Sequence, residues 1–372
     1  MASNLFTPVR VGAVELNHRV AMAPLTRLRA DADHVQLPLA ATYYEQRASI
    51  PGTLIIAEAT QISARHGGVP HGPGIWSEAQ IQSWKKITDA VHAKGSYMFC
   101  QLIALGRAGN PDTLQKEGGF DLAAPSAIPM DPATFDEKST PREMTEEEIN
   151  QAIHDFTAAA KNAIRAGFDG VEVHGANGYL VDQFLQDVTN QRSDAWGGSI
   201  PNRARFAVKM ATALVEAVGA EKVGFRLSPW NTWQGMRMVD PVPQFSYLAE
   251  QLKSLGLAYL HVIEPRVINN VDTVNGEGES LKFILDIWGK TSPVLVAGGY
   301  NPSNAAAVFD DYKDNEVVVV FGRHFLANPD LPYRIGHGLS LNKYHRDTFY
   351  TPMGEEGYAD YPFSASFLAS KS

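Results

Sequence analysis

The stretch Val171-Glu172-Val173-His174-Gly175-Ala176-Asn177-Gly178-Tyr179 (VEVHGANGY) changes character partway along. It begins as a β-branched apolar run and ends with a histidine, an asparagine and a tyrosine among glycines. A short, continuous apolar run is typical of a strand buried on both faces, and glycines are typical of the turn that follows a strand. The stretch therefore predicts a buried parallel strand whose carboxyl end presents polar side chains.

Runs of the same kind recur along the chain, and with the one at 170–174 they number eight. The others are RVAMAP (19–24), TLIIAE (53–58), SYMFCQL (96–102), VGFRLS (223–228), AYLHVIE (258–264), PVLVAG (293–298) and VVVVFG (317–322). Amphipathic stretches lie between them, such as residues 78–95 with apolar side chains at helical spacing. Alternating strands and helices predict an α/β fold with a parallel sheet.

Several residues mark where helices begin and end. Thr145 and Glu148 have the form of a capping box before the helix that runs to Gly167, a natural stop. Asn301-Pro302 and Asn328-Pro329 each place an N-cap before an N1 proline, which predicts helices opening after the seventh and eighth strands.

Eight strand-helix units follow one another in 372 residues without a break in composition. They predict one TIM barrel, (β/α)8, formed by a single domain of residues 1–372. A long insertion, about 104–144, would follow the third strand. A doubly wound sheet is the alternative.

Bulk composition excludes several partners. The net charge of −9 and the lack of a basic run argue against nucleic acid as a partner, and no stretch approaches the roughly 20 apolar residues of a membrane span.

Cys100 is the only cysteine, which suits a reducing compartment, so we expect a cytoplasmic protein. His66 and His71 have no third ligand beside them, and we expect no metal.

In a barrel of this kind, the carboxyl ends of the strands build the active site. Those ends carry Pro24 to Arg27, Glu58 to Thr60, Gln101, His174, Arg226, Glu264 to Arg266, Gly298-Gly299 and Gly322-Arg323. The two glycine-containing ends can bring backbone N–H groups and a guanidinium to one phosphate, although two tight turns and a surface arginine would look the same. No dinucleotide fingerprint, phosphate-binding P-loop, serine elbow or zinc helix is present.

The turn after the fourth strand has its own chemistry. His174 and Asn177 can both donate to one oxygen, and Tyr179 can deliver a proton. A buried histidine bonded to backbone, an asparagine shaping a turn and a packed tyrosine are the structural alternative.

The chain resembles the Old Yellow Enzyme family of FMN-dependent ene-reductases over essentially its whole length, most closely the fungal members. The motifs are APLTR (23–27), GIWSEAQ (74–80), HGANGYLVDQFL (174–185), GGSIPNRARF (197–206), GFRLSPW (224–230), EPRV (264–267), FGRHFLANPDLP (321–332) and KYHRDTFY (343–350). The resemblance implies a TIM barrel that holds FMN at its C-terminal face.

The resemblance also implies a role for each site residue. His174 and Asn177 would bind the substrate carbonyl oxygen, Tyr179 would protonate the substrate, and Tyr350 would close the pocket. The remaining residues would hold FMN: Pro24, Leu25, Thr26, Ala59, Gln101 and Arg226 at the ring, and Gly298, Gly299, Gly322 and Arg323 at the phosphate.

The implied reaction is the reduction of an α,β-unsaturated aldehyde or ketone by NADPH, with both molecules using one site in turn. Ile103, where yeast members often have tryptophan, would leave more room above the flavin. A dedicated secondary-metabolite reductase or isomerase of the chanoclavine-aldehyde type is the alternative within the enzymes, and a non-catalytic flavin-binding protein is the alternative outside them. The protein would act as a monomer or homodimer.

Overall fold

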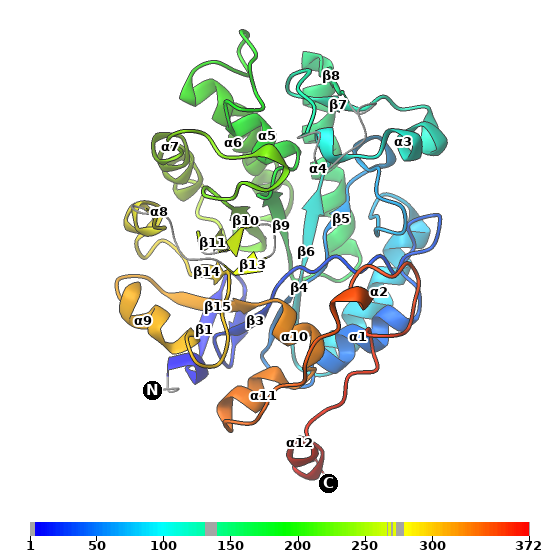
Figure 1. Cartoon of the computed structure of the whole chain (residues 1–372), viewed down its shortest axis with the longest axis vertical. Coiled ribbons are helices and arrows are strands. Elements are labelled where there is room, and N and C mark those ends of the chain that lie inside the picture. Colours follow the sequence, from blue (N-terminus) through cyan, green and yellow to red (C-terminus); the bar gives the residue numbers. More distant parts are fainter. Residues whose placement is uncertain (1–3, 131–139, 266, 269–270, 273–278, 372) are drawn as a thin grey trace.

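The structure is a computed structural model that describes residues 4–130, 140–265, 267–268, 271–272 and 279–371. Its centre is a closed parallel barrel (Figure 1). The barrel strands are β3 (Val20–Met22), β4 (Leu54–Ile56), β6 (Tyr97–Ile103), β9 (Gly170–Gly175), β10 (Val223–Leu227), β11 (Tyr259–Ile263), β14 (Val294–Ala297) and β15 (Val317–Phe321). Each pairs with the next in parallel, and β15 pairs with β3, which closes the ring. All eight predicted strands and the TIM-barrel fold are confirmed, and the doubly wound alternative is wrong.

Helices follow the strands around the barrel. They are α1 (Leu39–Arg47), α2 (Glu78–His92), α4 (Glu146–Arg165), α5 (Leu180–Leu185), α6 (Ile200–Val218), α7 (Val242–Lys253), α8 (Lys282–Trp288), α9 (Val308–Asp311), α10 (Arg323–Ala327), α11 (Leu331–Gly336) and α12 (Ala365–Ala369). The predicted insertion after the third strand holds α3 (Pro111–Gly118), β7 (Ala123–Ala124) and β8 (Arg142–Glu143). Because it follows the carboxyl end of β6, it lies on the side of the barrel where strand ends can form a site.

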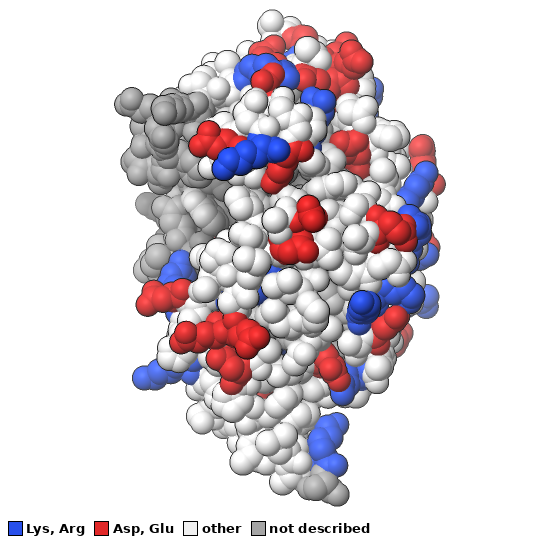
Figure 2. All heavy atoms as spheres, turned by 90° about the vertical axis from the view of Figure 1, so that its right-hand side faces the viewer, with Lys and Arg blue, Asp and Glu red and all other residues white. Residues whose placement is uncertain are grey.

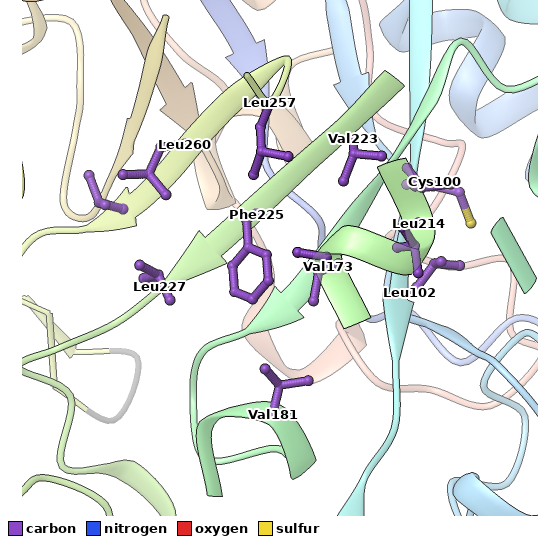
Figure 3. Close-up of a cluster of buried hydrophobic side chains, with 14 of the residues drawn as sticks. Cys100, Leu102, Val173, Val181, Leu214, Val223, Phe225, Leu227, Leu257 and Leu260 are labelled. Carbon is purple, nitrogen blue, oxygen red and sulfur yellow. The ribbon is translucent and has the colours of Figure 1, made fainter. Parts of the chain in front are cut away.

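Side chains alternate along each strand between two apolar cores. Outward-facing residues such as Val173 and Phe225 pack against the surrounding helices, as Figure 3 shows for Val181 of α5 and Leu214 of α6. Cys100 lies in this outer core, where burial raises the pKa of its thiol to about 12. The thiol is therefore an inert packing group.

The inward-facing residues form a second, smaller core. Side chains of Leu54, Phe99 and Leu295 fill the lower barrel, and they pack with the hairpin of β1 (Val9–Val11) and β2 (Val14–Leu16). The hairpin closes the amino end of the barrel with apolar side chains. Polar inward-facing residues can therefore gather only at the opposite, carboxyl end of the strands.

The helix-start predictions were partly right. Thr145 forms the predicted capping box with Glu148 at the start of α4. The predictions at Asn301 and Asn328 were wrong: after β14 the first α-helix begins at Val308, and α11 begins after Asp330. Asn328 instead donates from Nδ2 to the carbonyl oxygens of His324 and Asn342, so its side chain joins two loops.

On the surface, basic and acidic side chains are interspersed over the face drawn in Figure 2. Among the described residues, no helix is long and apolar enough to cross a membrane. Within the same residues, no group of three or more His, Cys, Asp or Glu side chains could hold a metal ion.

Candidate active site

A cavity of about 240 Å³ opens at the carboxyl ends of the barrel strands. It is lined by every residue to which the family resemblance gave a role: Pro24, Leu25, Thr26, Ala59, Gln101, His174, Asn177, Tyr179, Arg226, Gly298, Gly299, Gly322, Arg323 and Tyr350. These positions span more than 300 residues of sequence, so the fold brings them together. Four other strand-end candidates, Arg27, Glu58, Thr60 and Glu264, are buried and are not among the lining residues. Ile103 is buried and is not among the lining residues.

Strand register builds a polar layer beneath this cavity. Arg226 on β10 is in register with His174 on β9 and with His261 on β11. One step lower, Gln101 on β6 is in register with Glu172 on β9. Their neighbours along each strand point outward into the helical core, so these side chains point into the barrel.

Glu172 is the anion of this layer. Its carboxylate accepts from Gln101 Nε2 at 2.7 Å and lies 2.8 Å from Nδ1 of His261. Burial raises the pKa of Glu172, but His261, Arg226 and Gln101 together outweigh burial and lower it. The carboxylate is therefore ionised at neutral pH and balances the buried guanidinium of Arg226.

His174 is a neutral imidazole at the edge of the cavity. Burial, followed by the charges of Arg226 and His261, lowers the pKa of His174 well below its ordinary value. Its Nδ1 is buried and has no hydrogen-bond partner among the described residues. A buried polar atom costs free energy unless it is bonded, so this nitrogen is suited to a ligand in the cavity.

Asn177 is oriented by two contacts. The residue has a φ of 59°, and its backbone N–H donates to Oγ of Ser228 at 2.8 Å. Its Oδ1 accepts from Nδ2 of Asn231 at 2.7 Å. Because the amide oxygen is already bonded, the amide NH₂ of Asn177 is the group left to donate into the cavity.

Tyr179 provides a protonated phenol beside these donors. Its ring lies edge-on to the His174 ring, with centroids 4.8 Å apart. Burial raises the pKa of the Tyr179 hydroxyl, and Tyr350 adds to the rise, while Gln234 and Arg226 oppose it. The hydroxyl therefore keeps its proton at neutral pH and can act as an acid.

The end of β14 has the backbone shape of an anion cradle. Gly298 and Gly299 have φ values of 122° and 61°, which side chains rarely allow, so glycine is required there. Arg323 lines the same cavity, with its guanidinium 5.6 Å from the centroid of the Tyr344 ring. Adjacent N–H groups in such turns and a nearby guanidinium suit a phosphate.

The predicted strand end at 264–266 lies only partly within the described residues. Glu264 is buried and accepts from the hydroxyls of Tyr300 at 2.6 Å and Tyr312 at 3.0 Å, so it supports Tyr300 at the cavity wall. Arg266, which was also a candidate, lies outside the described residues.

The C-terminal segment reaches back to the cavity and is held there by buried arginines. Arg27 donates to the carbonyl oxygens of Phe349 (3.1 Å) and Gly357 (2.7 Å). Arg29 donates to those of Phe349 (2.9 Å) and Gly354 (2.9 Å). Phe349 and Tyr350 both line the cavity, so the first strand's loop and the C-terminal segment form one wall.

Sequence reasoning missed several lining residues, among them Asn231, Trp233, Tyr300, His324 and Arg346. Arg346 and Phe349 lie in the KYHRDTFY stretch, which pointed only to Tyr350. Asn231 and Trp233 follow the GFRLSPW motif directly, and that position after a strand end was a usable signal.

Comparison with known proteins decides the family. A profile of the NADH:flavin oxidoreductase / NADH oxidase family matches residues 4–342. The chain belongs to this family, that of Old Yellow Enzyme. It is 56% identical over 371 residues to the NADP-dependent oxidoreductase lnbE of Aspergillus flavus, a match that covers 98% of this chain and 97% of that protein. It is 54% identical over 366 residues to the chanoclavine-I aldehyde reductase fgaOx3 of Penicillium roqueforti, covering 98% of each.

A solved structure agrees with the family assignment. Old Yellow Enzyme from a Pichia species matches with a TM-score of 0.89 and 38% identity, covering 98% of this chain and 95% of that one. The resemblance seen in the sequence is confirmed. The protein is a flavin oxidoreductase of the Old Yellow Enzyme family, with FMN as its cofactor and a nicotinamide nucleotide as its electron donor.

The residues present fit FMN. Gln101 uses its Nε2 to bond Glu172, which leaves its Oε1 to accept from a ring N–H in the cavity. Nε of Arg226 is buried without a partner among the described residues, as expected of a donor awaiting an electron-rich ring edge. The glycine turn at 298–299 suits the phosphate at the other end.

Proposed function

We propose that this member of the Old Yellow Enzyme family is an ene-reductase that uses NADPH to reduce the C=C bond of α,β-unsaturated aldehydes and ketones. The observation that carries the proposal is the grouping of two donors, His174 and Asn177, with the protonated hydroxyl of Tyr179 around one cavity. We propose that residues 1–372 act as one FMN-binding domain, as a monomer or homodimer. We place the enzyme in the cytoplasm, since a lone cysteine suits a reducing compartment.

The ring of FMN would be held by Thr26, Gln101 and Arg226, beside Pro24, Leu25 and Ala59. Its phosphate would be held by Gly298, Gly299, Gly322 and Arg323. Bound there, FMN would supply the hydride chemistry, which passes a hydride from NADPH to the β-carbon of the alkene. The cation at Arg226, balanced by Glu172, favours a cofactor that gains negative charge at its ring edge.

The chain's own residues would supply orientation and a proton. His174 and Asn177 would donate to the carbonyl oxygen and stabilise the negative charge that develops there. Tyr179 would transfer its hydroxyl proton to the α-carbon, so hydride and proton together saturate the C=C bond. The tyrosinate then recovers a proton from water.

A specialised substrate is a second candidate, favoured by the 54% identity to a chanoclavine-I aldehyde reductase. Purified holoenzyme offered simple enones and a chanoclavine-type aldehyde would separate the two. Turnover of enones supports the general ene-reductase, and turnover of the aldehyde alone supports the specialist. NADPH oxidation with neither class, in protein that carries flavin, would refute the proposed reaction.

A further inference from the structure

A buried polar helix lies directly behind the proposed proton donor. Helix α5 begins after Tyr179, and its residues Asp182 and Gln183 are fully buried, as is Gln186 just beyond it. Buried polar side chains of this kind need partners for every group that burial removes from water. Their partners lie in the loops that form the cavity wall.

Asp182 receives two donors on its two oxygens. Oδ2 accepts the backbone N–H of Gly178 at 2.9 Å, and Oδ1 accepts Nε2 of Gln186 at 2.8 Å. Gly178 lies between Asn177 and Tyr179 and has a φ of 80°, next to the left-handed Asn177. The carboxylate therefore pins the middle of the turn that presents both side chains to the cavity.

Gln186 extends this link to a second loop. Its Oε1 accepts the backbone N–H groups of Arg237 at 2.8 Å and Met238 at 3.2 Å. The same loop carries Asn231, which bonds Oδ1 of Asn177, and Trp233, which lines the cavity. One chain of hydrogen bonds thus joins the turn, the short helix and the loop.

Gln183 and Arg107 join the loop after β6 to the same assembly. Oε1 of Gln183 accepts the backbone N–H of Arg107 at 3.1 Å, and its Nε2 donates to the carbonyl oxygen of Gly178 at 2.7 Å. Arg107 in turn donates to the carbonyl oxygen of Gln234 at 2.6 Å. Three active-site loops therefore meet around Asp182.

We propose that Asp182 is a positioning residue, whose carboxylate holds the Asn177–Tyr179 turn and the 231–238 loop in the arrangement needed for proton transfer. Only an ionised carboxylate satisfies both donors that reach it. An amide or a protonated carboxyl has a donor of its own, which would face either Gly178 or Gln186. Gln186 could accept from such a donor only by rotating its amide. That rotation would turn its NH₂ toward the N–H groups of Arg237 and Met238, where donor would meet donor.

The charge state of Asp182 is poised within the physiological range. Burial raises the pKa of its carboxyl to about 7, against the opposing effects of Gln186, Gly178 and Arg107. Of the other nearby cations, Arg237 pairs with Glu279, and Arg203 of α6 donates to Leu185 and Gln244. Above pH 7 the Asp182 carboxylate is therefore mostly ionised and accepts both hydrogen bonds. As the pH falls through 7, protonation of the carboxyl weakens its hold on the turn and the loop.

The test is Asp182→Asn, with Asp187→Asn as the matched control, because Asp187 is a nearby exposed acid in the same stretch. Both holoenzymes are followed by stopped flow, with flavin reduction by NADPH and reoxidation by an enone measured separately from about pH 5.5 to about pH 8.5. Calorimetry measures the affinity for phenol, a mimic of the substrate oxygen that involves no turnover. Flavin content and melting temperature monitor folding.

We expect reoxidation by wild-type enzyme to fall toward acid with an apparent pKa near 7. Asp182→Asn should be about tenfold slower at alkaline pH, the effect of losing one charged hydrogen bond, and should lack that inflection. It should bind phenol more weakly, while flavin reduction changes little and Asp187→Asn behaves as wild type. A variant that keeps the wild-type reoxidation rate, inflection and phenol affinity overturns the proposal.

The kinetic arm rests on the proposed alkene reduction, and the phenol arm does not. If none of the enones reoxidises the reduced flavin of the wild-type enzyme, the proposed function fails. The affinity for phenol still decides whether Asp182 positions the turn. If Asp182→Asn does not fold, Gln186→Met removes the link to the 231–238 loop together with one of the two donors to Asp182. It should raise the KM for the enone and move the inflection to higher pH, because the Gln186 hydrogen bond lowers the pKa of Asp182, and an unchanged KM overturns the link.

Discussion

Replacing Tyr179 with phenylalanine should slow alkene reduction while leaving flavin reduction by NADPH nearly unchanged. The substitution removes one hydroxyl and keeps the ring that lies edge-on to His174 at 4.8 Å. No backbone contact of the turn depends on that hydroxyl: the turn is held through Asn177 by Ser228 and through Gly178 by Asp182. The variant should therefore fold normally and retain FMN.

The size of the effect follows from what can replace the lost acid. A positioned general acid contributes roughly a hundredfold to ten-thousandfold to a rate. Tyr179 is only partly buried and lines the cavity, so we expect water to replace part of the lost acid in the variant. We therefore expect a loss near the lower end, about a hundredfold in flavin reoxidation, or about 2.7 kcal/mol.

Stopped-flow spectroscopy at the flavin absorbance band measures the two half-reactions separately. The decisive quantity is the ratio of the two losses in one preparation of Tyr179→Phe. Equal losses in both half-reactions would mean that the tyrosine shapes the cavity and does not deliver the proton. A reoxidation rate within about threefold of wild type would show that another group is the acid.

Three further substitutions test the surroundings of the site. Asn231→Ala frees the amide of Asn177 to rotate, so phenol affinity should fall about tenfold, the worth of one hydrogen bond; unchanged calorimetry would contradict this orientation. Glu172→Gln leaves Arg226 uncompensated and should lower the free energy of unfolding by about 3 kcal/mol, and an unchanged melting temperature would count against the charge balance. Arg29→Met removes donors to four carbonyl groups of the C-terminal segment, so limited proteolysis should cut residues 348–356 sooner, and equal cleavage rates would argue against the clamp.

The barrel could be predicted because each strand is buried on both faces and so forms a continuous apolar run. Glu172 interrupts such a run, and its role could not be predicted from the sequence. Its partners, His261 and Gln101, are 89 and 71 residues away, and strand register alone brings them together. A local pattern indicates that a residue is buried but carries no information on which charge it meets.

The same distinction explains the helix starts. Thr145 could be predicted because both bonds of its capping box fall within four residues of sequence. Asn328 also has a local helix-start signature, an N-cap residue before a proline, but the backbone N–H of Asn342, 14 residues away, donates to its Oδ1. A tertiary contact outcompeted the local cap, and the helix begins after Asp330 instead.

The site has two parts that should respond differently to substitution. Arg226, Glu172 and Gln101 belong to strands whose register the whole barrel sets, so changes there alter charge beneath the cofactor without moving loops. Asn177 and Trp233 sit on loops joined by the bond between Asn231 and Asn177, and Tyr350 sits in the C-terminal segment held by the buried arginines of the loop after β3. Each such bond is worth about 1 kcal/mol and can be lost without unfolding the barrel. Differences in substrate choice between relatives that share this barrel should therefore arise in the loops. Asp182 is the position at which one substitution reaches the Asn177–Tyr179 turn, the 231–238 loop and the loop after β6 together.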